Sequence, residues 1–567
     1  MATENKPWLS SYAEGVPHEI DLPTGSLADL IAASAAEWPD NVALEFFGRE
    51  TTYAELADQI ARGAETLRGL GVRKGDIVAL VLPNCPQHVV AFYAALRLGA
   101  IVVEHNPLYT PRELRHQFED HEAKIVIAWD KVVATLQEFP KDVAPEHIIS
   151  VNMTDAMPGH LRLALSLPIP SVRKRRAQLT TRVSDTMTWS RFIGSKPLAG
   201  LVPAPTVEDV ALIQYTSGTT GFPKGATLTH LNLAVNAAQA RAWVPDVPRG
   251  TAVVYAVLPM FHAYGLTLCL TFAMSMGARL VLFPTFDPDL VLPVVKKRPA
   301  TFLPAVPPIY ERLTRAAQEK KVSLKGIAIS ISGAMPLSQA VVEPWEEQTG
   351  GYLVEGYGLS ETSPVLMANP VSESRKAGTV GLPLPGTEVR VVDPEDPATD
   401  VRTGQPGELL VRGPQVFSGY WKKPEATAEV FVDGWFRTGD IVTIDADGFV
   451  KITDRIKEIV ITGGFNVAPS EVEETLRQFD GVADVAIVGL PSERNGEDVV
   501  AAVVQAPGKT VSAESLREFG KANLAAYKVP RQVFIVDELP KSLIGKVLRK
   551  KVRDELIARV ESGTPKV

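Results

Sequence analysis

One stretch of the chain combines small hydroxyl residues, glycines and a lysine directly after a predicted buried strand. The strand is expected over residues 210–213, and it leads into Tyr-Thr-Ser-Gly-Thr-Thr-Gly-Phe-Pro-Lys-Gly at positions 215–225. Glycines let a backbone turn tightly and approach a ligand, hydroxyls donate to phosphate oxygens, and a lysine adds positive charge. The stretch therefore predicts a polyphosphate-binding loop that uses Thr216, Ser217, Gly218, Thr219, Thr220, Gly221 and Lys224.

Two other interpretations of this loop fit its residues less well. A P-loop NTPase needs Gly-Lys-Ser/Thr at the start of a helix, whereas here Pro223 precedes Lys224 and Gly225 follows it. A flexible surface loop would explain the glycines and hydroxyls but not the preceding buried strand or the closing Pro-Lys-Gly. Phosphate binding is therefore the preferred interpretation.

Composition limits the class of protein. A chain of 567 residues with 45% hydrophobic and 22% charged residues is typical of a globular protein with more than one domain. The net charge of -8 argues against a general nucleic-acid binder. Two distant cysteines without metal-ligand spacing, and a start without a signal-peptide pattern, indicate a cytoplasmic protein. Residues 250–278 lack charge, but Pro259 and His262 interrupt them, so a buried strand, loop and helix are expected.

The order of predicted elements indicates the fold class. Apolar strands separated by helices occupy the first part of the chain, which favours βαβ units and largely parallel sheets. From Val380 onward the strands become short and are separated by Gly and Pro turns, which indicates a β-rich, barrel-like subdomain. A smaller unit begins near residues 454–458. We predict a large α/β N-terminal domain over residues 1–455 and a small α+β C-terminal domain over residues 456–567.

The stretch from Leu161 to Arg182 differs from the rest of the chain. Five apolar residues precede a run of four basic ones, a combination that can mark a membrane-surface segment. The simpler interpretation is a solvated loop, because Pro168 and Pro170 interrupt any long helix. The residues concerned are Leu161, Leu163, Leu165, Leu167 and Ile169, followed by Arg173, Lys174, Arg175 and Arg176.

Further motifs follow the loop at sensible distances. Glu361 in Tyr-Gly-Leu-Ser-Glu is a magnesium candidate, because Mg²⁺ takes oxygen ligands and shares them with nucleotide phosphates. Asp440 follows a Gly turn, and its carboxylate could accept two hydrogen bonds. Lys546 lies in Lys-Ser-Leu-Ile-Gly-Lys near the C-terminus. Taken alone, each of these has a structural explanation as a surface turn or a solvated lysine.

Together these motifs resemble, in family order, the signatures of the adenylate-forming enzymes, which include acyl-CoA synthetases, luciferases and peptide-synthetase adenylation domains. Residues 106–114 and the 161–182 segment are similar to bacterial long-chain fatty acid–CoA ligases. The resemblance implies an enzyme that uses ATP to convert a fatty acid to acyl-AMP and pyrophosphate, then transfers the acyl group to CoA. It also implies that the C-terminal domain is mobile.

The resemblance assigns a role to individual residues. It places Tyr357 on the adenine, Ser360 on the α-phosphate and Glu361, with Thr216, on Mg²⁺; the family more often has threonine in place of Ser360, but the hydroxyl is kept. It places Asp440 and Arg455 on the ribose. Other residues expected to line the nucleotide site are Gly333, Ala334, Glu355 and Gly356.

The remaining roles concern the two half-reactions. Lys546 is expected to reach the attacking carboxylate and the α-phosphate, where a cation offsets developing negative charge. Lys457 falls at the hinge position, and His262 is expected to face the acyl carboxylate and gate the thiol. The passage for CoA is expected to be bordered by Gly463, Gly464 and Phe465.

Two alternatives stay open from the sequence. One is a fatty acyl-AMP ligase that loads a carrier protein, and the other is a non-catalytic fatty-acid- or nucleotide-binding protein, which would have little need for Lys546. The expected partners are a fatty acid, ATP, Mg²⁺ and CoA, without nucleic acid. Peripheral contact with the inner face of the cell membrane and a homodimer are left open.

Overall fold

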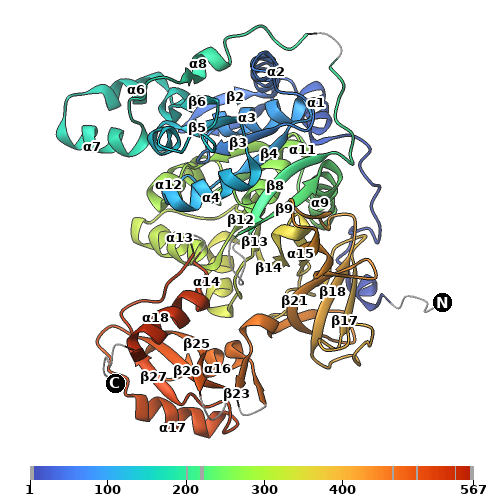
Figure 1. Cartoon of the computed structure of the whole chain (residues 1–567), viewed down its shortest axis with the longest axis vertical. Coiled ribbons are helices and arrows are strands. Elements are labelled where there is room, and N and C mark those ends of the chain that lie inside the picture. Colours follow the sequence, from blue (N-terminus) through green and yellow to red (C-terminus); the bar gives the residue numbers. More distant parts are fainter. Residues whose placement is uncertain are drawn as a thin grey trace. The chain divides into compact units, whose positions relative to one another are not determined.

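The structure is a computed structural model that describes residues 6–199, 202–216, 223–462, 465–492, 496–542 and 545–561 (Figure 1). Its contacts divide the chain into two compact units. The larger unit consists of Trp8–Glu388 and Arg412–Phe431, and the smaller unit contains Val389–Val411 and Val432–Val567. The domain boundary predicted at residue 455 stays a prediction.

The first sheet of the larger unit has eight strands in the order β19-β9-β8-β4-β3-β5-β6-β7. Its central strands are parallel and almost completely buried, as expected for Val- and Ile-rich strands covered on both faces. The antiparallel pair of β8 and β9 turns back through the predicted phosphate loop. The bounds are β3 (Ile77–Val81), β4 (Ile101–Glu104), β5 (Ile125–Trp129), β6 (His147–Val151), β7 (Met187–Thr188), β8 (Val210–Thr216), β9 (Lys224–Thr229) and β19 (Gly419–Tyr420).

Helices with clear start signals cover this sheet. Capping boxes begin two of them: Thr52 with Glu55 begins α2, and Thr110 with Glu113 begins α4. Helix α3 is buried along nearly its whole length and packs against α2, β3 and β4. The helices of the first half of the larger unit are α1 (Leu27–Glu37), α2 (Tyr53–Gly69), α3 (Pro86–Arg97), α4 (Pro111–His121), α5 (Val133–Gln137), α6 (Gly159–Ser166), α7 (Pro170–Leu179), α8 (Trp189–Phe192) and α9 (His230–Trp243).

A second sheet of nine strands completes the larger unit, in the order β16-β15-β14-β13-β12-β10-β11-β1-β2. Helices α12 (Pro288–Lys297), α13 (Pro307–Lys320) and α14 (Gln339–Thr349) alternate with its parallel strands. The strand bounds are β1 (Val42–Phe46), β2 (Arg49–Thr52), β10 (Val253–Ala256), β11 (Arg279–Leu282), β12 (Phe302–Ala305), β13 (Ile329–Ser332), β14 (Tyr352–Gly358), β15 (Val365–Ala368) and β16 (Leu382–Pro383).

The uncharged residues 250–278 form the predicted buried strand, loop and helix. Strand β10 is followed by α10 (Ala263–Gly265), a π-helical stretch, η4 (Leu266–Thr271), and α11 (Phe272–Ser275), and every residue of these three helical pieces is buried. Throughout the part of the chain that the structure describes, no helix is long and apolar enough to cross a membrane.

The segment 161–182 is helical, so the interpretation as a loop was wrong. It lies in two short helices, α6 (Gly159–Ser166) and α7 (Pro170–Leu179). Pro168 falls in the link between them, and Pro170 occupies the first position of α7. Proline is tolerated there because the first N–H groups of a helix have no partner within it. The two prolines therefore separate two helices and do not prevent them.

The smaller unit contains two five-stranded sheets. The first is the predicted β-rich part, in which the pairs β18–β21 and β21–β22 are antiparallel. Its strands are β17 (Glu388–Val392), β18 (Gly407–Arg412), β20 (Phe431–Val432), β21 (Trp435–Ile444) and β22 (Val450–Arg455). The second sheet is built from β23 (Val460–Thr462), β24 (Phe465–Val467), β25 (Val482–Ser492), β26 (Gly496–Gln505) and β27 (Gln532–Ile535).

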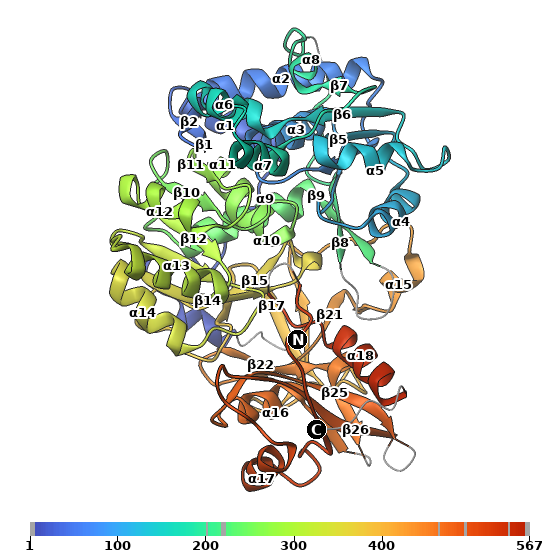
Figure 2. The same ribbon diagram turned by 90° about the vertical axis from the view of Figure 1, so that its left-hand side faces the viewer.

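Side-chain alternation along β25 explains why helices cover both faces of the second sheet. Val485 and Ile487 join a core with residues of α16 (Pro469–Leu476) and α17 (Ala513–Asn523), whereas Ala486 and Val488 join another core with residues of α18 (Arg549–Glu561) (Figure 2). The predicted fold class, a large α/β part with parallel sheets and a small α+β part, is confirmed.

Candidate active site

The base of the predicted phosphate loop is the end of the β8–β9 hairpin. Thr216 and Lys224 are partners across the two strands, and Thr216 Oγ1 donates to the Lys224 carbonyl at 3.4 Å. The hairpin thus brings together the first hydroxyl and the lysine of the motif. The other residues predicted to bind phosphate, Ser217, Gly218, Thr219, Thr220 and Gly221, lie outside the described residues.

Tyr420 connects this hairpin to the predicted magnesium ligand, and sequence reasoning missed it. Strand β19 pairs with β9, so Tyr420 lies opposite Ala226. The Lys224 ammonium is 5.0 Å from the centre of the Tyr420 ring, and the Tyr420 hydroxyl donates to Glu361 Oε1 at 2.9 Å. The only local sequence signal for Tyr420 is its position in Gly-Tyr-Trp, directly before two lysines.

Glu361 is held in a short 3₁₀ helix, η5 (Ser360–Thr362), which contacts both β8 and β9. Its side chain is buried, and its carbonyl accepts a hydrogen bond from Phe417 N at 2.8 Å. No cluster of three or more His, Cys, Asp or Glu that could hold a metal occurs among the described residues. Nucleotide-bound Mg²⁺ needs only one or two carboxylates besides phosphate oxygens, so Glu361 and the Thr216 hydroxyl fit that ion.

The predicted nucleotide-lining residues lie together where β13 and β14 run side by side. Ser332 pairs with Glu355, so Gly333 and Ala334 follow β13 next to the end of β14. A Cβ atom on Gly333 would lie 3.0 Å from the Tyr264 ring, so a side chain at this position would be tight. Ala334 has a left-handed backbone with φ +65°. The sequence predicted this grouping without giving its geometry.

Glu355 is a half-buried acid on β14, next to Gly356 and Tyr357 in the sequence. Leu337 N donates to its Oε2 at 3.2 Å, and burial raises the pKa of Glu355 to about 8. A carboxyl group with this pKa is mostly protonated at neutral pH and can donate a hydrogen bond. Tyr357 is also buried, and a Cβ on Gly358 would lie 1.8 Å from the Pro364 carbonyl oxygen, so only glycine fits beside it.

His262 caps the short helix α10 in the larger unit. Its Nδ1 accepts a hydrogen bond from Tyr264 N at 3.3 Å, and burial lowers its pKa, which favours the neutral imidazole. The preceding residue is tied to β8, because Gln214 Nε2 donates to the Phe261 carbonyl at 3.0 Å. The structure therefore places His262 on a loop anchored to the strand that leads into the phosphate loop.

In the smaller unit, the two predicted ribose contacts lie together. Asp440 and Arg455 are direct partners across β21 and β22, and Arg455 Nε lies 2.7 Å from Asp440 Oδ1. The Asp440 carboxylate is only 2% exposed, and Gly439 before it has φ +72°, as the predicted tight turn requires. The ion pair orients a buried carboxylate that can accept hydrogen bonds.

Lys546 reaches the same region of the smaller unit from a turn near the C-terminus. Lys541 and Val547 pair across this turn, Ser542 N donates to the Lys546 carbonyl at 2.7 Å, and Gly545 has φ +83°. Burial, aided by the positive charge of Arg455, lowers the pKa of Lys546 to about 8. Asp440 acts in the opposite direction, so the ammonium lies within electrostatic range of both ribose-contact candidates.

The predicted hinge is tied to the C-terminal helix by a residue that sequence reasoning missed. Lys457 lies in the 3₁₀ helix η6 (Ile456–Glu458), and the next residue, Glu458, forms an ion pair with Arg549. Arg549 also donates to Glu473 at 2.9 and 2.8 Å. Of the predicted CoA-passage residues, Phe465 begins β24, whereas Gly463 and Gly464 lie outside the described residues.

Comparison with known proteins identifies the class that this fold and site define. The profile described as AMP-binding enzyme matches residues 31–421, and that of the AMP-binding enzyme C-terminal domain matches residues 471–546. The chain belongs to the AMP-binding enzyme family, and the resemblance to adenylate-forming enzymes is confirmed.

Individual relatives match almost from end to end. The chain is 37% identical over 556 residues to a long-chain-fatty-acid–CoA ligase of Bacillus subtilis, covering 97% of this chain and 98% of the relative. It is 38% identical over 562 residues to an enzyme of the same name from Escherichia coli O157:H7, covering 98% and 99%. The crystal structure of ATP-bound MatB from Rhodopseudomonas palustris is similar with a TM-score of 0.80 and 31% identity, covering 93% and 98%.

Proposed function

We propose that this protein is a ligase that uses ATP to activate a long-chain fatty acid as acyl-AMP and then transfers the acyl group to CoA. Pyrophosphate leaves in the first step, and AMP leaves when the CoA thiol attacks the acyl carbon. The observation that carries the proposal is the near end-to-end match to relatives that bear this name. A match of this extent includes both units and the segment that joins them.

The first half-reaction needs a triphosphate that is held and partly neutralised while a carboxylate attacks the α-phosphorus in line. In the proposal, Thr216, Lys224 and the loop between them bind the phosphates. Glu361 and Thr216 would hold Mg²⁺, which supplies positive charge at the phosphate oxygens. Tyr420 positions the Glu361 carboxylate through its hydrogen bond and lies beside the Lys224 ammonium.

The nucleoside would be bound by groups whose chemistry suits it. Tyr357 offers an aromatic face to the adenine, and the protonated carboxyl of Glu355 offers a donor. Ser360 would contact the α-phosphate. Asp440 would accept hydrogen bonds from the ribose hydroxyls, and Arg455 keeps that carboxylate oriented. The backbone of Gly333, Ala334 and Gly356 would line the same site.

Lys546 is proposed to act in acyl-AMP formation. Its ammonium would contact the attacking carboxylate and the α-phosphate, and it would offset negative charge as the pentacovalent arrangement forms. Burial lowers the pKa of Lys546 to about 8. Bound phosphates and carboxylate are anions, so their arrival favours the protonated lysine.

The second half-reaction is assigned to a different arrangement of the same residues. Lys457 would serve as the hinge, and the segment Gly463, Gly464 and Phe465 would border the CoA passage. His262 would face the acyl carboxylate and gate the thiol. Its lowered pKa keeps the imidazole neutral, and because Nδ1 accepts from Tyr264 N, the ring proton lies on Nε2, which can donate a hydrogen bond to the acyl carboxylate.

A panel of fatty acids, assayed for AMP release with and without CoA, tests the proposal. Lys546→Ala should abolish acyl-AMP formation and spare thioester formation from supplied acyl-AMP. Lys541→Ala is a matched control in the same turn, where the lysine is paired with Asp484 at 2.7 Å, and it should keep both activities.

The outcomes separate the alternatives. Acyl-AMP that accumulates and is not consumed by CoA would favour the ligase that loads a carrier protein. A protein that binds fatty acid or ATP but forms no AMP with any acid would overturn the enzymatic proposal. The proposal includes peripheral contact with the membrane, in which long-chain fatty acids dissolve. It leaves open a homodimer, which light scattering of the purified protein tests.

A further inference from the structure

The helical hairpin formed by α6 and α7 has no apolar face buried in this protein. Neither helix contains a single buried residue, although the two pack against each other. Figure 1 shows the pair at one edge of the larger unit, beyond β5 and β6, and this edge faces the viewer in Figure 2. Helices of eight and ten residues are marginal in water without packing. A contact outside the chain would supply the missing packing.

The attachments of the hairpin to the larger unit are polar. Trp129 Nε1 and Lys131 Nζ donate to the carbonyls of Leu179 and Ala177, at 2.8 and 2.6 Å, at the C-terminal end of α7. Near the start of α6, Arg162 pairs with Asp155 at 3.3 Å. The hairpin is therefore held near its ends, and Leu163, Leu167 and Ile169 stay exposed.

Exposed apolar side chains are concentrated at the junction of the two helices. Seven large hydrophobic side chains are exposed among the described residues, and three of them lie within residues 163–169. These are Leu163, Leu167 and Ile169, which are 69%, 44% and 47% exposed. Such a concentration marks an interaction site, whereas isolated exposed hydrophobic residues are ordinary.

The charge of the hairpin is opposite to that of the remaining chain. Residues 159–182 contain six basic residues and no acidic residue, whereas the whole chain carries -8, which leaves -14 for the rest. Arg173, Lys174, Arg175 and Arg176 on α7 are all exposed. Positive charge next to exposed apolar residues, on a protein that is otherwise acidic, is complementary to an anionic lipid surface.

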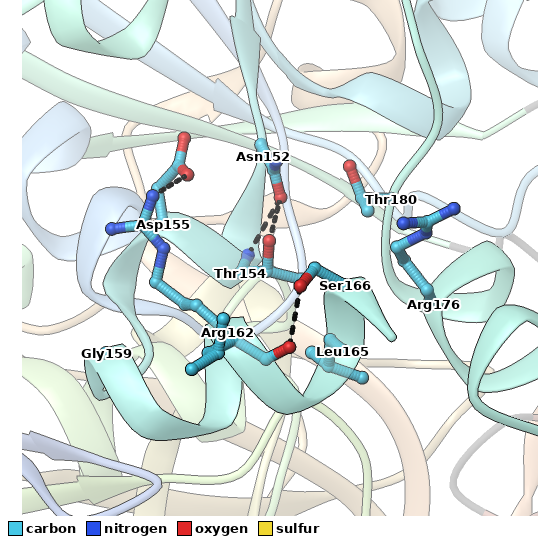
Figure 3. Close-up of a pocket in the computed structure, with 10 residues that line it drawn as sticks. Asn152, Thr154, Asp155, Gly159, Arg162, Leu165, Ser166, Arg176 and Thr180 are labelled. Atoms are coloured by element: carbon cyan, nitrogen blue, oxygen red, sulfur yellow. Dashed lines mark hydrogen bonds and ion pairs between the residues drawn. The ribbon is translucent and has the colours of Figure 1, made fainter. Parts of the chain in front are cut away.

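A hollow of about 480 Å³ lies between the hairpin and the turn at residues 152–155 (Figure 3). Arg162 and Arg176 stand on opposite sides of it, and Ser166 and Thr180 add hydroxyl groups. Guanidinium and hydroxyl groups donate hydrogen bonds that suit phosphate oxygens. The Asp155 carboxylate pairs with Arg162 and neutralises part of the positive charge. The hollow is large enough for a lipid headgroup phosphate.

We propose that the α6–α7 hairpin docks this protein on an anionic bilayer. Leu163, Leu167 and Ile169 enter the boundary between headgroups and acyl chains, and the basic residues of α7 lie against lipid phosphates. The purpose of the contact rests on the proposed function, since the fatty acid is dissolved in the bilayer, but the binding itself does not. The surface thus brings the enzyme to the phase that holds its substrate.

The test is sedimentation of the full chain, without ATP or CoA, with vesicles of phosphatidylcholine alone or with phosphatidylglycerol. Wild type should bind the anionic vesicles at low salt and lose binding as salt rises, because charges are screened over roughly 8 Å at physiological ionic strength. Each basic residue at the surface raises affinity by about fivefold, so changing Arg173, Lys174, Arg175 and Arg176 to Gln should weaken binding by roughly a hundredfold or more.

Two further variants test whether vesicle binding depends on the hairpin or on the net charge of the protein. The first removes four exposed basic residues of the smaller unit and should bind vesicles like wild type; its changes are Arg402→Gln, Arg517→Gln, Lys550→Gln and Lys551→Gln. The second, Leu163→Ser with Leu167→Ser and Ile169→Ser, should bind more weakly and keep its salt dependence. None of the three hairpin side chains is buried, so these variants should fold, which circular dichroism checks.

Three results would overturn the docking surface. They are unchanged binding after loss of the four basic residues of α7, equal weakening in the matched charge control, and no binding of wild type to anionic vesicles at low salt. The last would favour an acidic protein surface as the partner. Ligase activity on detergent-dispersed fatty acid is measured in parallel and should be unchanged in every variant. If the wild-type protein binds anionic vesicles but shows no ligase activity, the proposed function is contradicted, whereas the docking surface is not.

Discussion

The ammonium group of Lys546 is expected to set an upper pH limit on acyl-AMP formation. Burial, aided by Arg455, lowers its pKa from an ordinary 10.5 to about 8. A lysine is charged below its pKa and neutral above it, and the proposed role requires the charge. The value of kcat/KM for the first half-reaction should therefore fall as pH rises through about 8.

The size of the effect follows from the loss of one proton. With a pKa of about 8, the charged fraction at about pH 9 is roughly a tenth of that at neutral pH, and at about pH 10 roughly a hundredth. Pyrophosphate release in the absence of CoA isolates this half-reaction. Because kcat/KM reports the pKa values of groups in the free enzyme, it is the quantity in which the ionisation of Lys546 should appear.

Two variants decide whether Lys546 causes the decline. Burial raises the pKa of Glu355 to about 8 as well, so its ionisation falls in the same pH range. Lys546→Arg keeps its charge throughout this range, so only the ionisation of Glu355 should lower its activity above pH 8, and its decline should be shallower than that of wild type. Glu355→Gln should keep the decline. An arginine variant with the same decline as wild type would refute the reasoning.

The same pKa makes an independent prediction for stability. Between about pH 8 and 10.5 the unfolded chain binds a proton at Lys546 that the folded protein does not, so the contribution of this group to unfolding free energy rises with pH. Below pH 8 the protonated lysine lowers stability. Lys546→Met should therefore raise the unfolding midpoint of the unliganded protein at neutral pH, and scanning calorimetry should find this gain reduced above pH 10.5.

Three other residues carry sharp expectations. Tyr420→Phe removes the donor to Glu361, and it should raise the Mg²⁺ concentration needed for half-maximal acyl-AMP formation by about tenfold; an unchanged magnesium titration would contradict the positioning role. Lys457→Pro should trap one domain arrangement, so that acyl-AMP accumulates with CoA present, and equal losses in both half-reactions would make Lys457 an ordinary linker residue. Arg549→Ala leaves the buried Glu473 carboxylate without its main partner and should lower the free energy of unfolding by about 3 kcal/mol in urea titrations; a loss below about 1 kcal/mol would count against that assignment.

Local patterns in the sequence determined most of the elements and the order of the motifs. The apolar runs at β3, β4 and β5 are long enough to be strands. Thr52 and Glu55 mark the start of α2, because the hydrogen bonds of their capping box lie within one turn. The Gly439 turn depends likewise on glycine geometry and neighbouring residues. Such features depend on contacts within a few residues, which a sequence displays directly.

The hairpin shows where local signals compete. Pro168 and Pro170 argue against a helix in the interior of a segment, but the same residue type is favoured at the first turn of one. The sequence does not say which of these positions a proline takes. The structure places Pro170 at the start of α7, so the same residues that predicted a loop separate two helices.

Side-chain partnerships far apart in the chain came only from the tertiary structure. Tyr420 meets Glu361 across 59 residues because β19 pairs with β9 beside η5, and Arg549 meets Glu458 across 91 residues because α18 packs on β25 next to the hinge. The chain itself marks Glu361, Asp440 and Lys546 as chemically suited residues. Strand register and helix packing decide which neighbours orient those groups and shift their pKa values. The spacing of residues along the chain does not determine the register or the packing.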